Sequence, residues 1–365
     1  MLQLFLVSGS TEADRHSFLA DLGLLPWAVS MDSFRALYSS PMMTRNARLT
    51  QGTQHDELAL SKLLEVVEHR MKYGETTFIN LGDDARHSDR IRKLAGAWGY
   101  EVSDIAFCEA ESASQTIGAS GLSERLMATP EDFTGRFREV VFVGDIHGCV
   151  APLRRLLSKQ FDRDKLFIFV GDLFDRGPEN GEVFKIMRDL VELPNVKLVS
   201  GNHELHLRSW LNKRSTSGEF RNNTLPQLFK SGFNRQAAER LLSKAINLLQ
   251  FSFKGARFQV THGALAGVVT EPFLFPGYQC WRGVGKRLDL IDEAFEENAE
   301  AGWFQVHGHS NAQGRVITPG QRSFNLESSV EFGGKLSALS YDGSRFKDIS
   351  VKNTGGSKVK KGKAA

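Results

Sequence analysis

The chain contains 365 residues, and its 41% hydrophobic and 24% charged residues are typical of a globular protein that buries a core. Lysine and arginine exceed aspartate and glutamate by 46 − 43 = 3, too small an excess to indicate a nucleic-acid partner by itself. Three cysteines without a Cys-x-x-Cys spacing argue against a disulfide framework or a zinc knuckle. No apolar run approaches the roughly 20 residues of a membrane span. At about 150 residues per domain, we expect two domains of an intracellular protein without membrane contact.

The N-terminal part of the chain alternates short apolar runs with longer amphipathic ones. The chain start lacks the basic region and cleavage site of a signal peptide, and it predicts a first strand over residues 4–7. Apolar residues at helical spacing predict a helix over 57–71, followed by a strand over 76–79 and a helix over 90–98. Strands that alternate with helices indicate a parallel α/β sheet, which we assign to a first domain over residues 1–110.

Small and polar residues then dominate, with Ser112-Ala113-Ser114 as one of the clearest runs. Such a composition is typical of a linker, which we place at residues 111–135. A second α/β pattern predicts a domain over residues 136–352. The lysines of residues 353–365 indicate a flexible basic tail.

Five apolar strands of the second domain each run into glycine and into residue types that bind metals. The strands are predicted over residues 140–143, 166–170, 196–199, 258–260 and 303–306, and they lead to Asp145 and His147, Asp172, Asn202 and His203, His262, and His307 and His309. Sites on α/β sheets lie beyond the carboxyl ends of strands, so we expect these side chains to meet. Mixed nitrogen and oxygen ligands suit Mn²⁺, Fe or Zn²⁺ better than Ca²⁺, and a carboxylate such as Asp172 can bridge two metals.

Three motifs in this domain resemble those of the binuclear metallophosphoesterases, in their phosphoprotein-phosphatase-like branch. They read Gly144-Asp145-Ile146-His147-Gly148, Gly171-Asp172-Leu173-Phe174-Asp175-Arg176-Gly177 and Gly201-Asn202-His203-Glu204. The resemblance extends over about residues 140–351. It implies a calcineurin-like α/β sandwich for the second domain, with two mixed sheets flanked by helices.

The same resemblance implies a role for each matched residue. Asp145, His147 and the bridging Asp172 would hold one metal, and Asp172, Asn202, His262 and His309 would hold a second. His203 would be the general acid, oriented by Asp175, and Arg176 would hold phosphate oxygens with its planar fork. The implied cofactors are two divalent ions, Mn²⁺ by preference, with Fe, Zn²⁺, Ni²⁺ or Co²⁺ as alternatives. A hydroxide shared by the two ions would attack phosphorus.

The C-terminal stretch, with Phe324-Asn325-Leu326-Glu327, resembles the end of bacterial and phage polynucleotide kinase–phosphatases, which heal RNA ends. Those enzymes usually have aspartate at the position of Glu327, so the resemblance implies that Glu327 supports the metal ligands or contacts substrate, and Arg282 is a further candidate for the same roles. The resemblance implies a cytoplasmic enzyme that removes a 2′,3′-cyclic or terminal phosphate from a polynucleotide. An RNA ligase would then be a partner, and the oligomeric state is left open.

Other functions fit the same residues. A Ser/Thr protein phosphatase, with a phosphoprotein as substrate, would carry an indistinguishable metal site, and a dinucleoside tetraphosphate hydrolase would use the same chemistry. A catalytically idle binding scaffold is the alternative from a different class. We favour an active phosphatase because every expected ligand position and His203 are filled.

The N-terminal segment resembles the kinase domain of the same RNA-healing enzymes, with an altered phosphate-binding loop. Ser8-Gly9 ends the first strand as such a loop requires. Asp14, Arg15 and His16 then stand where the motif has glycine, lysine and serine or threonine. We therefore predict a P-loop-kinase-like domain that has lost the ability to handle ATP.

Two more residues of this segment match the kinase pattern. Asp32 and Arg35 correspond to the base and to the arginine that holds the substrate phosphate, while Asn80 replaces an aspartate at the end of a strand. The alternative is an unrelated small α/β domain in which Asp32 and Arg35 are helix-start residues.

Three residues close to the phosphoesterase motifs are expected to play structural parts. His307 and His206 are interpreted as histidines outside the ligand set, and Cys149 as a packed thiol rather than a nucleophile.

Overall fold

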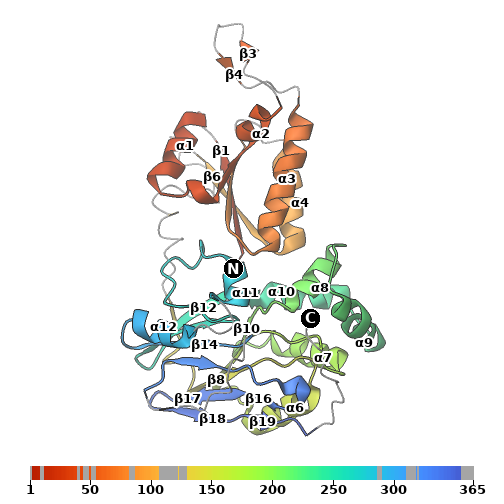
Figure 1. Cartoon of the computed structure of the whole chain (residues 1–365), viewed down its shortest axis with the longest axis vertical. Helices are drawn as coiled ribbons and strands as arrows, with labels where there is room; N and C mark the ends of the chain where they lie inside the picture. The colour runs from red at the N-terminus through yellow and green to blue at the C-terminus, as the bar shows by residue number, and fades with distance from the viewer. Residues whose placement is uncertain are drawn as a thin grey trace. The chain divides into compact units, whose positions relative to one another are not determined.

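The computed structural model describes residues 2–8, 12–38, 42–43, 49–50, 55–81, 87–106, 122, 130–285, 290–309, 318 and 320–354. The chain forms two compact units, drawn in Figure 1. Unit 1 comprises Met1–Ala128 and Thr270–Pro276, and unit 2 comprises Thr129–Val269 and Gly277–Ala365. Throughout the described ranges, every helix is too short or too polar to cross a membrane.

Three predicted features fall wholly or largely outside the described residues. They are Gly9 in the altered phosphate loop, the linker at 111–135 apart from residues 122 and 130–135, and the tail at 353–365 apart from its first two residues.

Unit 1 is built on a four-stranded parallel sheet of order β2-β5-β1-β6. Its strands are β1 (Gln3–Ser8), β2 (Ala28–Ser30), β5 (Thr77–Asn80) and β6 (Glu101–Ala106). The predicted parallel α/β sheet is thereby confirmed. The register places Val7 of β1 beside Asn80 of β5, so the carboxyl ends of these two strands are neighbours.

Helices cover both faces of this sheet, as the alternation of apolar side chains along β1 requires. The remaining elements of unit 1 are α1 (Glu12–Asp21), η1 (Leu25–Trp27), α2 (Met31–Ala36), β3 (Met42–Met43), β4 (Leu49–Thr50), α3 (Asp56–Lys72) and α4 (Ser88–Trp98). Leu4 and Leu6 join one apolar cluster with residues of α3 and α4, whereas Phe5 and Val7 join a second cluster with residues of α1. Figure 1 shows α3 and α4 together on one side of the sheet and α1 on the other.

The short segment Thr270–Pro276 belongs to unit 1, although the sequence division placed it in the second domain. Leu274 is buried in the cluster around Phe5, and its carbonyl accepts a hydrogen bond of 3.1 Å from the indole nitrogen of Trp27. Thr76 donates a hydrogen bond to the carbonyl of Phe273.

Unit 2 contains two mixed sheets, as predicted. The first has the order β11-β10-β9-β8-β17-β18, in which β8 to β11 are parallel and β17 is antiparallel to β8. Its strands are β8 (Glu139–Val143), β9 (Lys165–Phe169), β10 (Val196–Val199), β11 (Ala245–Ile246), β17 (Ala338–Tyr341) and β18 (Phe346–Asp348). The second has the order β15-β14-β13-β12-β7, with β13, β14 and β15 parallel.

The strands of the second sheet are β7 (Glu131–Asp132), β12 (Leu248–Phe253), β13 (Ala256–Thr261), β14 (Trp303–His307) and β15 (Ser323–Asn325). A separate two-stranded ribbon pairs β16 (Lys335–Leu336) with β19 (Val351–Lys352). Residues 130–135 had been assigned to the linker, but they contain β7 and the fully buried Phe133, whose ring contacts Phe251 of β12.

The two sheets of unit 2 pack face to face, and helices cover the other face of the first sheet. Val140 and Phe142 of β8 belong to the apolar core shared with the second sheet, while Val141 and Val143 belong to the core shared with the helices. The helices of unit 2 are α6 (Val150–Gln160), α7 (Asn180–Leu190), α8 (Glu204–Leu211), η3 (Phe220–Thr224), α9 (Leu225–Lys230), α10 (Arg235–Lys244), α11 (Gly277–Arg282), α12 (Ile291–Asn298) and η4 (Val330–Phe332). Both faces of β8 and β9 are buried, so the polar residues that directly follow these strands lie in the interior of unit 2.

Candidate metal centre

Loops at the carboxyl ends of five strands bring the predicted ligands together. Because β8, β9 and β10 are neighbours in the first sheet, the loops that follow them place Asp145, Asp172 and Asn202 at one edge. The loops after β13 and β14 of the second sheet supply His262 and His309. Apart from the partly buried His309, these side chains are buried. The predicted convergence of the strand ends therefore occurs across both sheets.

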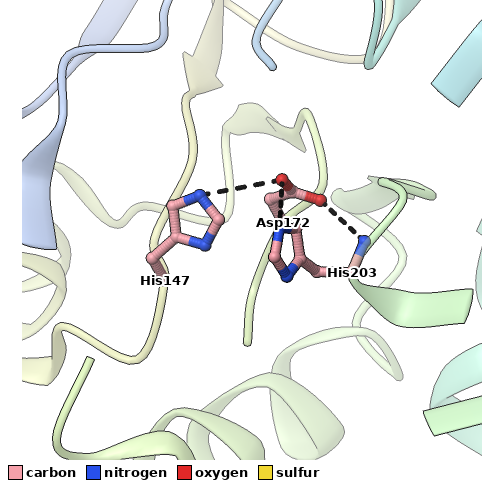
Figure 2. A group of neighbouring side chains, drawn as sticks. All are labelled: His147, Asp172 and His203. Atoms are coloured by element: carbon pink, nitrogen blue, oxygen red, sulfur yellow. Dashed lines mark hydrogen bonds and ion pairs between the residues drawn. The ribbon is translucent and has the colours of Figure 1, made fainter. Parts of the chain in front are cut away.

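The candidate ligand atoms form three overlapping groups, each with its atoms within 4.8 Å of one another. One group contains His147, Asp172 and His203, and a second contains Asp172, His262 and His309. Figure 2 shows the carboxylate of Asp172 between the side chains of His147 and His203. Asp172 belongs to both groups, and its Oδ2 faces Nε2 of His147, His203 and His262, so this carboxylate is the candidate for a bridge between two ions.

Several buried polar atoms at this edge have no hydrogen-bond partner. Oδ1 of Asp145, Oδ1 of Asn202, Nε2 of His262 and Oε2 of Glu327 are all in this state. A buried polar atom without a partner is costly, so a group of them points to a ligand that binds there. Oxygen and imidazole nitrogen atoms in this arrangement fit divalent ions of the Mn²⁺, Fe or Zn²⁺ type.

Hydrogen bonds fix which imidazole nitrogen faces the centre. Nδ1 of His147 lies 3.0 Å from the carbonyl oxygen of Phe174, and Nδ1 of His262 lies 2.8 Å from that of Val170. Nε2 of each ring therefore faces Asp172, at 3.7 Å for His147 and 3.2 Å for His262. Backbone carbonyls that hold Nδ1–H are the usual way in which proteins orient a metal-binding histidine.

The backbone of the site is strained at the residues that carry its chemistry. His147, Asp172, Asp175, Arg176 and His309 have φ values of 44°, 49°, 71°, 62° and 65°. Residues other than glycine rarely adopt this left-handed conformation, which costs of order 1–3 kcal/mol each and concentrates at functional sites. The surrounding fold holds these five residues in place against that cost.

Two glycines leave the space that the ligand loops need. A Cβ atom at Gly308 would overlap Oδ1 of Asp145, and one at Gly201 would overlap Oδ1 of Asp172. Glycine, which has no Cβ atom, therefore lets the backbone approach both carboxylates closely.

His203 is held by a buried carboxylate. Its Nδ1 lies 2.6 Å from Oδ2 of Asp175, whose other oxygen accepts a hydrogen bond from the hydroxyl of Thr224. Burial opposes the charged form of His203, but the carboxylates of Asp172 and Asp175 outweigh it and raise the pKa of the imidazole. A protonated imidazole with Nε2 directed towards Asp172 is suited to donate a proton.

Arg176 extends its guanidinium to the same place. Nη1 lies 2.9 Å from Nε2 of His147, and Nη2 lies 3.3 Å from Nε2 of His203. The side chain is 39% exposed, so it can reach both solvent and the ligand cluster. A phosphoryl group bound beside the two histidines would meet this guanidinium.

Glu204 braces the loops around Asp172, a role that the sequence analysis did not assign. Its Oε2 accepts hydrogen bonds from the backbone nitrogens of Asp172 and Gly201, at 2.9 and 2.7 Å, and its Oε1 accepts one from Leu173. Burial and the charge of Asp172 raise the pKa of Glu204 to about 7. The signal for this role was its place in the third motif, directly after His203.

The buried carboxylates of Asp145, Asp172 and Glu327 lie close together, and this arrangement favours the binding of cations. Burial raises the pKa of Asp145 well above its usual range, and the neighbouring Glu327 and Asp172 add to this effect. At Asp172 burial acts in the same direction, but His262 and His203 outweigh it and hold the pKa well below the usual range. Burial lowers the pKa of His309 to about 3, so this ring is uncharged at physiological pH.

Glu327 and Arg282, both expected near the site, lie beside it. The carboxylate of Glu327 forms a candidate ligand group with Asp145 and His147, so it lies among the candidate ligands rather than behind them. Arg282 is exposed at the end of α11, and its charge acts on His309 and His206. A hydrogen bond of 2.7 Å from Gly263 to the carbonyl of Cys280 fixes α11 to the loop after His262.

His307, His206 and Cys149, which were expected to have structural roles, make contacts that fit those roles. Nε2 of His307 lies 2.8 Å from Oδ1 of Asp292, which ties β14 to α12. His206 lies one turn beyond His203, and the two rings pack edge to face with their centroids 6.0 Å apart. Cys149 is buried, and burial raises the pKa of its thiol to about 12.

The N-terminal candidates Asp32 and Arg35 are paired with side chains inside unit 1. Arg35 binds Asp56 through two nitrogens, at 2.7 and 2.9 Å, and Asp32 at 2.7 Å. Ser30 caps α2 by accepting a hydrogen bond from the backbone of Asp32. Asp32 and Arg35 thus stabilise the start of α2 and its contact with α3.

Arg15, at the position of the phosphate-binding lysine, is also hydrogen-bonded to another side chain of unit 1. Its guanidinium is buried, and Nε donates a hydrogen bond of 2.7 Å to Oδ1 of Asn80 at the end of β5. Both replacements are visible in the sequence, but the hydrogen bond between the two side chains is not.

Comparison with known proteins supplies the family. The sequence profile described as calcineurin-like phosphoesterase matches residues 139–338, more than half of the chain. The chain belongs to the calcineurin-like phosphoesterase family. The family is named for phosphoesterases, which agrees with the predicted class of activity, and its members normally bind two metal ions.

Relatives within the family carry tetraphosphatase names. The symmetrical bis(5′-nucleosyl)-tetraphosphatase of Thioalkalivibrio sulfidiphilus is 48% identical over 68 residues, which are 18% of this chain and 24% of that protein. The chain thus spans about a quarter of the length of such relatives. The asymmetrical bis(5′-nucleosyl)-tetraphosphatase PrpE of Halalkalibacterium halodurans is 25% identical over 235 residues, 57% of this chain and 92% of that protein. A metallophosphoesterase structure from Sphaerobacter thermophilus is 16% identical, with a TM-score of 0.38, and the match covers 59% of this chain and 88% of that one.

Proposed function

We propose that this chain is a two-metal phosphoesterase that acts on the phosphorylated end of a polynucleotide, with Mn²⁺ as its preferred ion. The observation that carries the proposal is the set of buried, unpartnered ligand atoms gathered around Asp172 beside the His203–Asp175 pair. Asp145, His147, Asp172, Asn202, His262 and His309 would hold the ions. When bound, the ions would supply Lewis-acid chemistry, polarising the phosphoryl group and activating water.

The side chains of unit 2 would perform the remaining steps. Arg176 would bind equatorial phosphoryl oxygens through the guanidinium that already lies beside both histidines. His203 would donate its Nε2 proton to the leaving oxygen, and Asp175 would hold the ring in the required orientation through Nδ1. Glu204 would keep the backbone on both sides of Asp172 in place.

Two features support a polynucleotide end as the substrate: the motifs of the C-terminal stretch and the fold of unit 1. A parallel sheet whose first strand leads into Ser8-Gly9 is what a kinase-like neighbour domain requires. Unit 1 would not transfer phosphate from ATP, because Arg15 is bound to Asn80 and Arg35 to Asp56. We propose that unit 1 is a degenerate kinase-like domain and that an RNA ligase would complete the repair.

A second candidate is hydrolysis of bis(5′-nucleosyl) tetraphosphates. The match of 57% of this chain to nearly the whole of an asymmetrical tetraphosphatase favours it. The same metal ligands, Arg176 and His203 would serve, because the leaving group is again a phosphate-linked oxygen.

A substrate panel tests the proposal. With Mn²⁺ present, turnover would be measured on an RNA with a 2′,3′-cyclic end, a 3′-phosphorylated oligonucleotide, diadenosine tetraphosphate and a phosphoserine peptide. Preference for the RNA ends is the expected result, preference for the tetraphosphate would select the second candidate, and preference for the phosphopeptide would contradict both. Asp172→Asn should abolish turnover, while Asp189→Asn, at a carboxylate 74% exposed on α7, is the matched control.

A further inference from the structure

Arg176 is paired with a buried carboxylate that lies outside the three motifs. Its Nη1 donates to Oε1 of Glu331 over 2.9 Å, and the side chain of Glu331 is 1% exposed. The other oxygen of this carboxylate is buried without a hydrogen-bond partner. Because burying such an oxygen is costly, the presence of Glu331 calls for an explanation other than stability.

The ion pair decides where the guanidinium lies. Glu331 belongs to η4, a short element entered through the left-handed Ser329, with φ of 53°. The same Nη1 that meets Glu331 also meets His147, so the guanidinium is held between the carboxylate and the ligand cluster. A planar fork held at one corner presents its remaining N–H groups in a fixed direction.

The ion pair also decides how much positive charge a phosphoryl group would meet. Burial opposes the charge of Arg176, but Glu331 outweighs it, and together with Asp172 and Glu327 it raises the pKa of the guanidinium. Glu331 and Glu327 stand on one loop four positions apart and act on each other as well as on Arg176. A carboxylate beside the guanidinium offsets attraction for a dianion about twice as strongly as for a monoanion, because Coulomb energy is proportional to charge.

We propose that Glu331 is a specificity-determining residue: it positions Arg176 and lowers the positive charge at the phosphoryl position, so that the enzyme favours phosphoryl groups with one negative charge over dianionic monoesters. Diesters, cyclic phosphates and the inner phosphates of a tetraphosphate belong to the favoured class. The inference rests on the proposed role of Arg176. Among RNA ends it favours the 2′,3′-cyclic phosphate over the terminal monoester, and it also includes the inner phosphates of the second candidate substrate.

Two chromogenic probes test this preference in the full chain loaded with Mn²⁺. At pH 8, bis(p-nitrophenyl) phosphate is a monoanion and p-nitrophenyl phosphate a dianion. Glu331→Gln keeps the size of the side chain and removes its charge, so the ratio of kcat/KM for the monoester to that for the diester should rise about tenfold. The gain should appear mainly as a lower KM for the monoester.

Two matched variants separate charge from packing. Glu331→Asp retains the charge on a shorter arm, so both rates should fall while the ratio stays within about twofold of the wild type. Glu219→Gln removes a carboxylate that accepts a hydrogen bond from the backbone nitrogen of Arg176, at 3.0 Å, without touching the guanidinium, and it should leave the ratio unchanged.

A binding measurement gives a readout that does not depend on turnover. Calorimetric titration with inorganic phosphate should show about tenfold tighter binding by Glu331→Gln than by the wild type. An unchanged ratio and an unchanged phosphate affinity in a variant with wild-type melting temperature would overturn the inference. Failure of the wild type to hydrolyse either probe, or full activity of Asp172→Asn, would instead overturn the proposed function.

Discussion

The carboxyl ends of parallel strands are occupied in opposite ways in the two units. At the end of β5 in unit 1, Asn80 binds Arg15 of α1 in the interior. At the ends of β8, β10 and β13 in unit 2, Asp145, Asn202 and His262 carry buried atoms without a hydrogen-bond partner. Both places have the position in an α/β sheet at which ligands bind.

This contrast distinguishes polar groups that support the fold from polar groups that form a ligand site. Polar groups that satisfy one another stabilise a fold and leave nothing for a ligand to bind. Polar groups that are held in strained backbone and left unpartnered, as in unit 2, gain their partners only when a ligand arrives.

Removing the proposed acid of unit 2 should slow turnover and leave the metals in place. His203→Ala is expected to lower kcat by about 10²–10⁴-fold, the range typical of a lost general acid. Metal analysis of the purified variant should give the wild-type content. His206→Ala removes a neighbouring imidazole that takes no part in the proposed chemistry, and it should retain most of the turnover. Equal losses in the two variants would contradict the assignment.

Adding one methyl group should disturb the metal centre. In Gly308→Ala the new Cβ would overlap Oδ1 of Asp145 and displace a ligand, and a displacement of about 1 Å can cost about 10²-fold in rate. Gly302→Ala also lies in the region of β14 but meets no neighbouring atom, although its left-handed φ of 84° makes it strained. Comparable kcat/KM and metal affinity in the two variants would mean that space at Gly308 is not required.

Breaking the internal pair of unit 1 should affect stability rather than turnover. Arg15→Ala leaves the buried amide oxygen of Asn80 without this donor, which is expected to cost about 1–3 kcal/mol. Thermal unfolding followed by scanning calorimetry would measure the loss. A variant that keeps its stability and gains ATP binding would show that the arginine blocks a nucleotide site instead.

The described thiols should be unreactive in the folded protein. Burial raises the pKa of Cys149 and of Cys280 to about 12, so almost no thiolate is present at pH 8. In a Cys108→Ser background, a thiol reagent should label neither cysteine until the protein is denatured. Rapid labelling of Cys149 in the native state would contradict its interpretation as a packed thiol.

Much of this contrast was accessible from the sequence, because strands of unit 2 end in motifs whose spacing reflects a shared edge. Asp145, Asp172 and Asn202 could be placed together from the order of their strands alone. The charge pattern could not show that Glu331 turns inward, since a single glutamate between Val330 and Phe332 has no periodic signal. Its partner Arg176 lies far away in the chain, and only the tertiary fold brings the two together.

The same limit applies to unit 1. The replacements at Arg15 and Asn80 indicated a lost function, but the hydrogen bond between them depends on the pairing of β1 with β5. The membership of Thr270–Pro276 in unit 1 had no sequence signal either, because Leu274 reads as an ordinary loop residue until its packing with Trp27 is seen.

The most direct test of the account is the number of divalent ions bound per chain. After equilibration with Mn²⁺ and removal of free metal, elemental analysis should find two ions per wild-type chain, as the two ligand groups that share Asp172 predict. Asp172→Asn should lose both, and Asp189→Asn should keep both. A wild-type chain that retains no metal, or an Asp172→Asn variant with unchanged content, would contradict the assignment of this edge of unit 2 as a two-metal centre.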